Sequence, residues 1–428
     1  MKEDMYSMEQ KIFQPTLESV SSHSLPSWYD DCKLGIFIHW GLYSVPAWAE
    51  ETWELGAAPS DLDWFTHNPY AEWYLNTIRI EGSPAQIHHK KTYGENFPYE
   101  KFVDNFTCEN WDPKEWASLF KESGAGYVVL TTKHHDGFCL YPSKYTDYNS
   151  MNLGPKRDLT GDLTEAVRAE GLRMGTYYSG LLDWTTYEYP HVGNIKEDYN
   201  RTYNFADYSL NQAVELIDKY RPSLLWGDIG WPEKGRRDIP WLFSHYYNNV
   251  PDGVINDRFD SEWYDHSTAE YLMGTRSLTK KWEMCRGLGL SFGYNASEGD
   301  DTVLSSRDLV RLLVEYVSHN GNLLINVGPR ADGTIPEIQI SRLKDLGKWL
   351  SKYGDAIYGT RIWDERQKDT LANGAEVYYT RKGNDLYAII DNLPMDQTKV
   401  ILPICEKEVV VERYENYPVP VKLENYFK

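Results

Sequence analysis

Short apolar runs recur along the chain and alternate with longer segments of helical periodicity. Six of these runs are dense in β-branched and aromatic residues and almost continuously apolar, which is typical of parallel strands buried on both faces. The runs are Leu34–His39, Tyr127–Lys133, Arg173–Ser179, Ser223–Asp228, Gly253–Asp257 and Asn322–Val327. This alternation predicts repeated βα units.

Helical patterns fill the spaces between these runs. The segment Pro113–Ser123 follows Asp112 as a suitable N-cap and precedes Gly124, a common stop signal. Similar patterns cover Asp162–Glu170, Ala206–Tyr220, Pro240–Asn248, Ser305–Ser318 and the region around Arg342–Lys352. Two further strands between Glu270 and Tyr294 would complete a (β/α)₈-like barrel. A doubly wound open sheet is the alternative, but no glycine-rich dinucleotide loop follows any expected strand.

The pattern of apolar and polar residues changes near Thr360, from helical periodicity to short alternating segments. Short segments of alternating character, separated by turn residues, predict a small C-terminal antiparallel β-sandwich domain. These segments are Glu376–Arg381, Asp385–Asp391, Lys399–Pro403 and Glu408–Glu412. We therefore expect an N-terminal segment over 1–26, a catalytic barrel over 27–359 and a β domain over 360–428. A domain of that size is expected to lean on the barrel for stability.

Charge and composition narrow the classes of function. The net charge is −20, with 44 basic and 64 acidic residues, so the basic footprint of a nucleic-acid partner is missing and an anionic membrane surface is disfavoured. No run of about 18 apolar residues predicts a membrane span. The polar N-terminus lacks the apolar region of a signal peptide, so we expect a cytoplasmic protein, or a secreted or periplasmic one if a leader was removed. The five cysteines are scattered, which argues against a disulfide framework.

Reactive side chains gather where the expected strands end. In a barrel, these C-terminal strand ends form the active-site face. His39 ends one strand, His134 and His135 follow a second, and Asp228 ends a third. Because Asp is a poor strand former and is rarely buried unpaired, Asp228 is either a turn residue or a carboxylate held in the barrel mouth. A sugar-cleaving site would need two such carboxyl groups.

The same segments resemble glycoside hydrolase family 29, the α-L-fucosidases. The resemblance extends over roughly residues 27–362 and rests most specifically on HWG at His39 and KHHDG at Lys133–Gly137. Further matching stretches are Gly35–Val45, Ala71–Tyr74, Thr131–Phe138, Gly175–Ser179, Leu225–Asp228, Asn256–Arg258, Trp282–Cys285, Gly293–Asn295 and Gly321–Gly328. The resemblance implies a (β/α)₈-like barrel, a C-terminal β-sandwich and a retaining exo-acting α-L-fucosidase that works by double displacement.

The resemblance also implies roles for individual residues. Asp228 matches the family's nucleophile. The positions that match substrate-binding residues, or residues beside the carboxylates, are His39, Glu72, Trp73, His134, His135, Tyr178, Trp226, Arg258 and Phe292. Fucose is a neutral 6-deoxy sugar, so a site for it needs neutral hydrogen-bonding groups and an apolar contact for its methyl group. Histidines and indole N–H groups would supply the former, and Phe37, Trp226 and Phe292 are candidates for the latter.

The acid/base is less closely specified by the motifs. Glu270 falls in a region of suitable placement after Asp228, and we favour it. Glu283 within Trp282–Cys285 is the alternative, although the resemblance suggests a supporting role there. Glu262 and Asp265 are further carboxyl groups downstream of Asp228.

Two other classes of function compete with this interpretation. A metal-dependent hydrolase would use His39, His134, His135 and Asp136, but adjacent strand residues normally point to opposite faces, which disfavours a shared ion. A non-catalytic sugar-binding barrel is the second, and a glycosidase for a different sugar is a closer neighbour of the favoured function. We expect no cofactor and no metal, and a fucosylated oligosaccharide or glycoconjugate as the substrate. The sequence leaves the fucosyl linkage open and is compatible with a homo-oligomer.

The segment Glu51–Pro69 separates the HWG strand from Ala71–Tyr74. It is longer than the resemblance leads us to expect. We expect it to build part of the wall that meets the leaving group.

Overall fold

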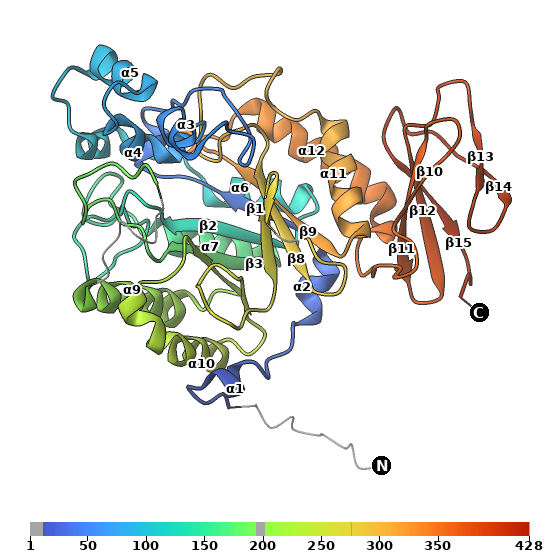
Figure 1. Ribbon diagram of the computed structural model, residues 1–428, viewed down its shortest axis with the longest axis horizontal. Helices are drawn as coiled ribbons and strands as arrows, with labels where there is room; N and C mark the ends of the chain where they lie inside the picture. Colours follow the sequence, from blue (N-terminus) through green and yellow to red (C-terminus); the bar gives the residue numbers. More distant parts are fainter. Residues whose placement is uncertain (1–11, 194–201, 275, 428) are drawn as a thin grey trace.

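The computed structural model describes residues 12–193, 202–274 and 276–427. Its centre is a curled sheet of parallel strands (Figure 1). The order across the sheet is β5-β4-β3-β2-β1-β9-β8-β6, with the short antiparallel β7 on the outer edge of β6. The bounds are β1 Leu34–Ile38, β2 Tyr127–Lys133, β3 Arg173–Ser179, β4 Leu224–Asp228, β5 Val254–Ile255, β6 Ser267–Glu270, β7 Met273–Gly274, β8 Trp282–Gly287 and β9 Gly321–Val327.

The sheet closes between β5 and β6 through a short contact. Asn256 and His266 form a single parallel bridge, and the Asp265 amide donates to the Ile255 carbonyl at 2.9 Å. The prediction of a (β/α)₈-like barrel is therefore confirmed. Of the two strands expected after Glu270, β8 lies where expected. The other strand, β6, ends at Glu270 instead of following it. The sequence did not reveal this strand, because its four residues are mostly polar and form no apolar run.

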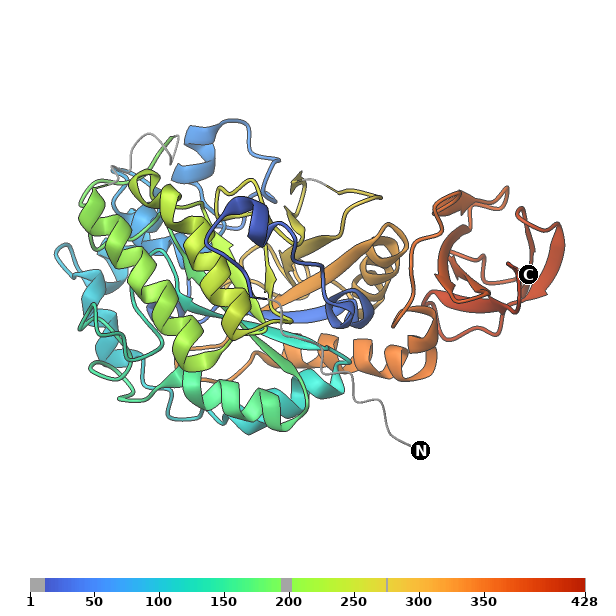
Figure 2. The ribbon, with the colours of Figure 1, turned by 90° about the horizontal axis from the view of Figure 1, so that it is seen from below.

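Helices surround the sheet in the order that the periodicity indicates (Figures 1 and 2). Asp112 caps α6 by accepting from the Lys114 amide, and Ser305 caps α11 by accepting from the Asp308 amide. In the described residues, no helix joins β5 to β6 or β6 to β8. The helices are α1 Leu17–Val20, α2 Ser27–Cys32, α3 Asp61–Thr66, α4 Tyr74–Ile78, α5 Pro84–Tyr93, α6 Pro113–Glu122, α7 Leu159–Ala169, α9 Tyr203–Tyr220, α10 Ile239–Asn249, α11 Ser306–Ser318 and α12 Glu337–Tyr353.

The C-terminal strands form a separate antiparallel unit beside the barrel (Figure 2). One sheet has the order β10-β11-β12-β15, and β13 pairs with β14 in a second sheet. The strands are β10 Lys368–Thr370, β11 Glu376–Lys382, β12 Asp385–Asp391, β13 Lys399–Leu402, β14 Lys407–Val410 and β15 Val419–Leu423. This unit is tied to the barrel: Arg307 of α11 donates to Asp391 at 2.7 Å, and the Trp349 indole of α12 donates to the Pro418 carbonyl at 2.8 Å.

Two remaining features bear on the expectations from composition. All five cysteines are free thiols. Within the described residues, every helix is too short or too polar to cross a bilayer.

Candidate active site

A cavity of about 500 Å³ opens at the C-terminal ends of the barrel strands. It draws its lining from strand ends and from the loops that follow them, as expected for this architecture. Ten of the residues selected from the sequence line it: His39, Glu72, Trp73, His134, His135, Trp226, Asp228, Arg258, Glu270 and Phe292. Glu283 and Tyr178 do not line the cavity.

Local backbone geometry delivers Asp228 to this cavity. Its neighbour Gly227 lies against the Phe259 ring, where a side chain would meet ring carbons at 2.4 Å. Ile229 directly after it has a φ of 66°, a left-handed conformation that is strained for a β-branched residue. The Ile229 amide donates to Asp228 Oδ1 at 2.9 Å. The strained residue thus follows directly after the carboxylate that its amide contacts.

The carboxylate of Asp228 is almost fully buried but well supplied with donors. Arg258 Nη1 donates to Oδ1 at 3.0 Å, and Tyr177 Oη donates to Oδ2 at 2.6 Å. Burial alone would raise the pKa of Asp228, but the Arg258 charge and these hydrogen bonds outweigh it and leave the pKa below its ordinary value. Asp228 is therefore held as a carboxylate at neutral pH.

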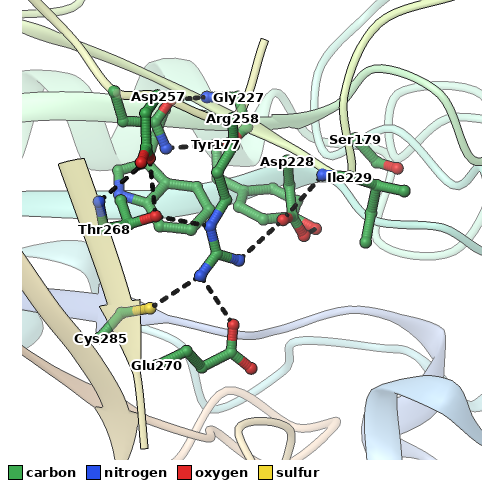
Figure 3. A network of polar contacts seen from close by, with 12 residues as sticks. Tyr177, Ser179, Gly227, Asp228, Ile229, Asp257, Arg258, Thr268, Glu270 and Cys285 are labelled. Atoms are coloured by element: carbon green, nitrogen blue, oxygen red, sulfur yellow. Dashed lines mark hydrogen bonds and ion pairs between the residues drawn. The ribbon is translucent and has the colours of Figure 1, made fainter. Parts of the chain in front are cut away.

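Arg258 links Asp228 to a second carboxylate (Figure 3). Its Nη2 donates to Glu270 Oε2 at 2.9 Å, while its Nε donates to Thr268 Oγ1 at 2.8 Å. Tyr70 Oη donates to the other Glu270 oxygen at 2.9 Å. One guanidinium thus contacts both carboxylates at the cavity. Glycoside cleavage uses two carboxyl groups that flank the scissile bond.

Glu283 lies deeper in the barrel, beneath the cavity. Glu283 lies on β8, two residues before the cavity-lining Cys285, and is completely buried. It accepts hydrogen bonds from Tyr29 Oη at 2.8 Å, from Tyr127 Oη, and from the Trp226 indole at 2.9 Å. These contacts fit a supporting role in the barrel interior. They occupy the Trp226 indole N–H, which leaves the Trp226 ring as the apolar surface that this residue offers the cavity.

Tyr178 is a correction, because its neighbour Tyr177 occupies the cavity instead. In the β3–β4 ladder, Tyr177 lies beside Trp226, whereas Tyr178 lies beside Gly227. Adjacent strand residues point to opposite faces, so Tyr177 shares the inner face with Trp226. Tyr178 points outward, where its hydroxyl donates to Gln212 of α9 at 2.9 Å. Sequence alternation could have revealed this only with the register known.

The two adjacent histidines both face the cavity, contrary to the alternation that we expected of them. The ladder between β2 and β3 shifts register at Thr131–Lys133, and β2 ends at Lys133. His134 and His135 therefore lie beyond the strand, with ring centroids 3.8 Å apart. Burial lowers the pKa of His135 to about 3 and that of His134 well below its ordinary value, so both rings are neutral.

The remaining predicted residues form the side walls. Phe292 packs against His39, with ring centroids 4.8 Å apart. Trp73 packs on His135 at 5.3 Å. Glu72 accepts from the Gly293 amide at 2.7 Å, and burial raises its pKa to about 8. Glu72 is consequently protonated near neutral pH and can donate as well as accept.

The segment between the HWG strand and Ala71 also contributes to the lining. It contains α3 and places Leu55, Trp64 and Phe65 on the cavity wall. β7 adds Met273 to the same wall. The sequence predicted that this segment forms a wall of the site but did not single out Leu55, Trp64 or Phe65 within it. Met273, Tyr70 and Thr268 carried no sequence signal for the site.

The described residues contain no group of three or more His, Cys, Asp and Glu side chains arranged to hold a metal ion. His39, His134 and His135 instead face the cavity beside the paired carboxylates.

Comparison with known proteins places this geometry in a family. A family model described as alpha-L-fucosidase matches residues 2–355. The chain belongs to this family, glycoside hydrolase family 29. An alpha-L-fucosidase of Dictyostelium discoideum is 35% identical over 404 residues, covering 91% of this chain and 83% of the relative. The chain is accordingly a glycoside hydrolase of the α-L-fucosidase family.

Solved structures agree with this placement. The crystal structure of Thermotoga maritima alpha-fucosidase in complex with fucose is 48% identical, with a TM-score of 0.83 and 96% coverage of each chain. A Bacteroides thetaiotaomicron alpha-L-fucosidase, solved as a trapped covalent intermediate with 2-fluoro-fucosyl fluoride, is 25% identical with a TM-score of 0.68. That alignment covers 93% of this chain and 95% of the other.

Proposed function

We propose that this enzyme removes terminal α-L-fucose from oligosaccharides or glycoconjugates with retention of anomeric configuration. Asp228 is the nucleophile and Glu270 is the acid/base. The observation that carries the proposal is the Arg258 guanidinium, which holds both carboxylates at one cavity. The covalent intermediate trapped in the Bacteroides relative supports a double displacement in this family.

In the first step, an Asp228 oxygen attacks the anomeric carbon. Oδ2 is the freer oxygen for this attack, because it accepts one hydrogen bond, from Tyr177, whereas Oδ1 accepts two, from Ile229 and Arg258. Glu270 must carry a proton at the start of this step; it gives that proton to the glycosidic oxygen, the bond from that oxygen to the anomeric carbon breaks, and a fucosyl ester forms on Asp228. In the second step, Glu270 takes a proton from water, which attacks the ester and releases fucose.

The walls of the cavity suit one terminal fucose residue. Phe37, Trp226 and Cys285, which are buried side chains of the barrel interior, contribute to its lining, and a barrel interior is a packed core rather than a channel. This favours exo action. Neutral histidines face the sugar hydroxyls, and Phe292 offers an apolar surface to the methyl group. The wall formed by Leu55, Trp64 and Met273 meets the leaving group.

Chemical rescue tests the nucleophile. Asp228→Gly removes the attacking carboxylate and leaves space beside Arg258, so hydrolysis of an aryl α-L-fucoside should fall to the background rate. Azide should then restore turnover and give the β-linked fucosyl azide. A matched control is Asp260→Gly, which changes another cavity-lining aspartate, one that accepts from Arg236 at 3.1 Å. Retained activity in Asp228→Gly, or rescue in the control alone, would refute the assignment.

A further inference from the structure

Two cavity histidines, His39 and His135, each form a hydrogen bond through Nδ1 to a polar side chain. That side chain in turn donates to a main-chain carbonyl, which fixes its orientation. His39 Nδ1 lies 2.7 Å from Asn326 Oδ1, and Asn326 Nδ2 lies 2.6 Å from the Phe292 carbonyl oxygen. A carbonyl oxygen can only accept, so the amide nitrogen must face it. The Asn326 oxygen therefore faces His39, and it can only accept as well. Hence His39 Nδ1 carries the proton.

The same logic applies to His135 with a hydroxyl in place of the amide. His135 Nδ1 lies 2.7 Å from Ser179 Oγ, and Ser179 Oγ lies 2.8 Å from the Leu182 carbonyl oxygen. A serine hydroxyl has one proton, and the carbonyl can only accept it. Ser179 must then accept from the ring, so His135 Nδ1 also carries the proton.

A neutral imidazole has one N–H, so the second nitrogen of each ring is an acceptor. Burial keeps both rings neutral by lowering the pKa of His39 and that of His135 to about 3. His135 Nε2 lies 3.8 Å from Asp228 Oδ2, at the reaction centre. His39 Nε2 makes no hydrogen bond within the described residues and is not one of their buried unpaired atoms, so it opens to the cavity.

We propose that Asn326 and Ser179 are positioning residues that fix His39 and His135 as hydrogen-bond acceptors for two donating hydroxyls of the bound sugar. The identity of the ligand rests on the proposed function, whereas the proton positions do not. A sugar carrying fluorine, a methyl ether or a ketone at either place has no proton to donate and leaves a buried nitrogen unpaired. The pair thus selects free hydroxyl groups.

The arrangement also protects the nucleophile. Because His135 Nε2 has no proton, it cannot donate to Asp228 Oδ2 and compete with the attack. His134 offers a contrast, since its Nδ1 is buried and has no partner among the described residues. Within the part of the chain that the structure describes, no carbonyl-anchored group fixes the proton of that ring.

Nitrogen-15 NMR of the ligand-free enzyme tests the proton positions directly. Protonated and bare ring nitrogens differ in frequency, so long-range proton–nitrogen spectra separate the two neutral forms and the imidazolium. His39→Gln and His135→Gln assign the two sets of signals. We expect both rings in the Nδ1–H form from about pH 5 to pH 8, where a free histidine titrates. An Nε2–H form or an imidazolium in either ring overturns the proposal.

A pair of variants on one strand separates positioning from folding. Asn326→Leu should change the His39 signals and weaken fucose binding about tenfold, the value of one neutral hydrogen bond at the upper end of its range. Asn322→Leu is the matched control, since Asn322 also lies on β9 and its amide also donates to a carbonyl, that of Tyr29, but it contacts no histidine. Unchanged His39 signals in Asn326→Leu overturn the proposal.

Ser179→Ala provides the same test on His135 if Asn326→Leu does not fold. Fucose analogues with one hydroxyl replaced by fluorine test which hydroxyls donate to the histidines, and calorimetry measures their binding. Fluorine at two of the three ring hydroxyls should weaken binding about tenfold each, and equal binding of all three analogues overturns the proposal. The spectra need no turnover, so failure of the fucosidase assignment would show separately, as absent hydrolysis with the expected histidine signals.

Discussion

Replacement of Arg258 by Met should move the acidic limb of the pH–activity profile toward neutral pH. The Arg258 guanidinium lies 3.0 Å from Asp228 Oδ1, and its charge opposes the effect of burial on that carboxyl group. A positive charge at this range lowers the pKa of an aspartate by about 1–3 units. Without it, burial raises the pKa of Asp228. The folded enzyme then loses its ionised nucleophile at a higher pH.

The size of the effect follows from the same contact. The limb should rise by about 1–3 units, and each unit corresponds to about 1.4 kcal/mol of lost preference for the carboxylate. The assay is kcat/KM for an aryl α-L-fucoside as a function of pH, since this ratio reports ionisations of the free enzyme. Circular dichroism at each pH confirms that the variant is folded.

Arg286→Met is the matched control for this experiment. Arg286 follows the cavity-lining Cys285 on β8 and is buried, but its ion-pair partner is Glu54 at 3.2 Å rather than Asp228. Its acidic limb should stay where the parent enzyme has it. An unshifted limb in folded Arg258→Met, or an equal shift in both variants, would refute the electrostatic reasoning.

Three further outcomes follow from the site. Glu270→Ala should slow fucosides with poor leaving groups by about 100- to 10,000-fold and activated aryl fucosides much less; the same pattern in a Glu283 variant would reverse the assignment. Glu283→Gln should cost about 1–3 kcal/mol of unfolding free energy in chemical denaturation, because three buried donors share that carboxylate, and a parent-like midpoint would contradict this. Phe292→Ser should narrow the preference for α-L-fucosides over 6-hydroxylated α-L-galactosides by about tenfold or more, measured as the ratio of kcat/KM values, with an unchanged ratio counting against the methyl contact.

The barrel and most of its site could be predicted because the relevant signals are local. Asp228 ends an apolar run, and the histidines follow or end others, so their convergence needs only the barrel rule. β6 has no apolar run, so the sequence predicted a strand after Glu270, whereas the strand lies before it and ends there. Tyr177 and Tyr178 could not be separated, since the answer depends on the register with β4.

The choice between the two glutamates shows a similar limit. Glu270 and Glu283 lie on neighbouring strands, where Glu270 pairs with Cys285 and Glu283 pairs with Thr268. Only this register shows that Glu283 lies one layer deeper than Glu270. Met273 of β7 was missed for another reason, because long-range packing alone brings it to the cavity wall. Trp64 lies in the segment that was expected to form a wall, but no local signal singled it out.

Trapping the covalent intermediate tests the central claim most directly. The enzyme would be incubated with 2-fluoro-fucosyl fluoride, digested, and mapped by mass spectrometry. The proposed mechanism predicts one fluorofucosyl group per inactivated molecule, attached to Asp228. A label on any other residue, or turnover without a label and with β-fucose as the first product, would contradict it.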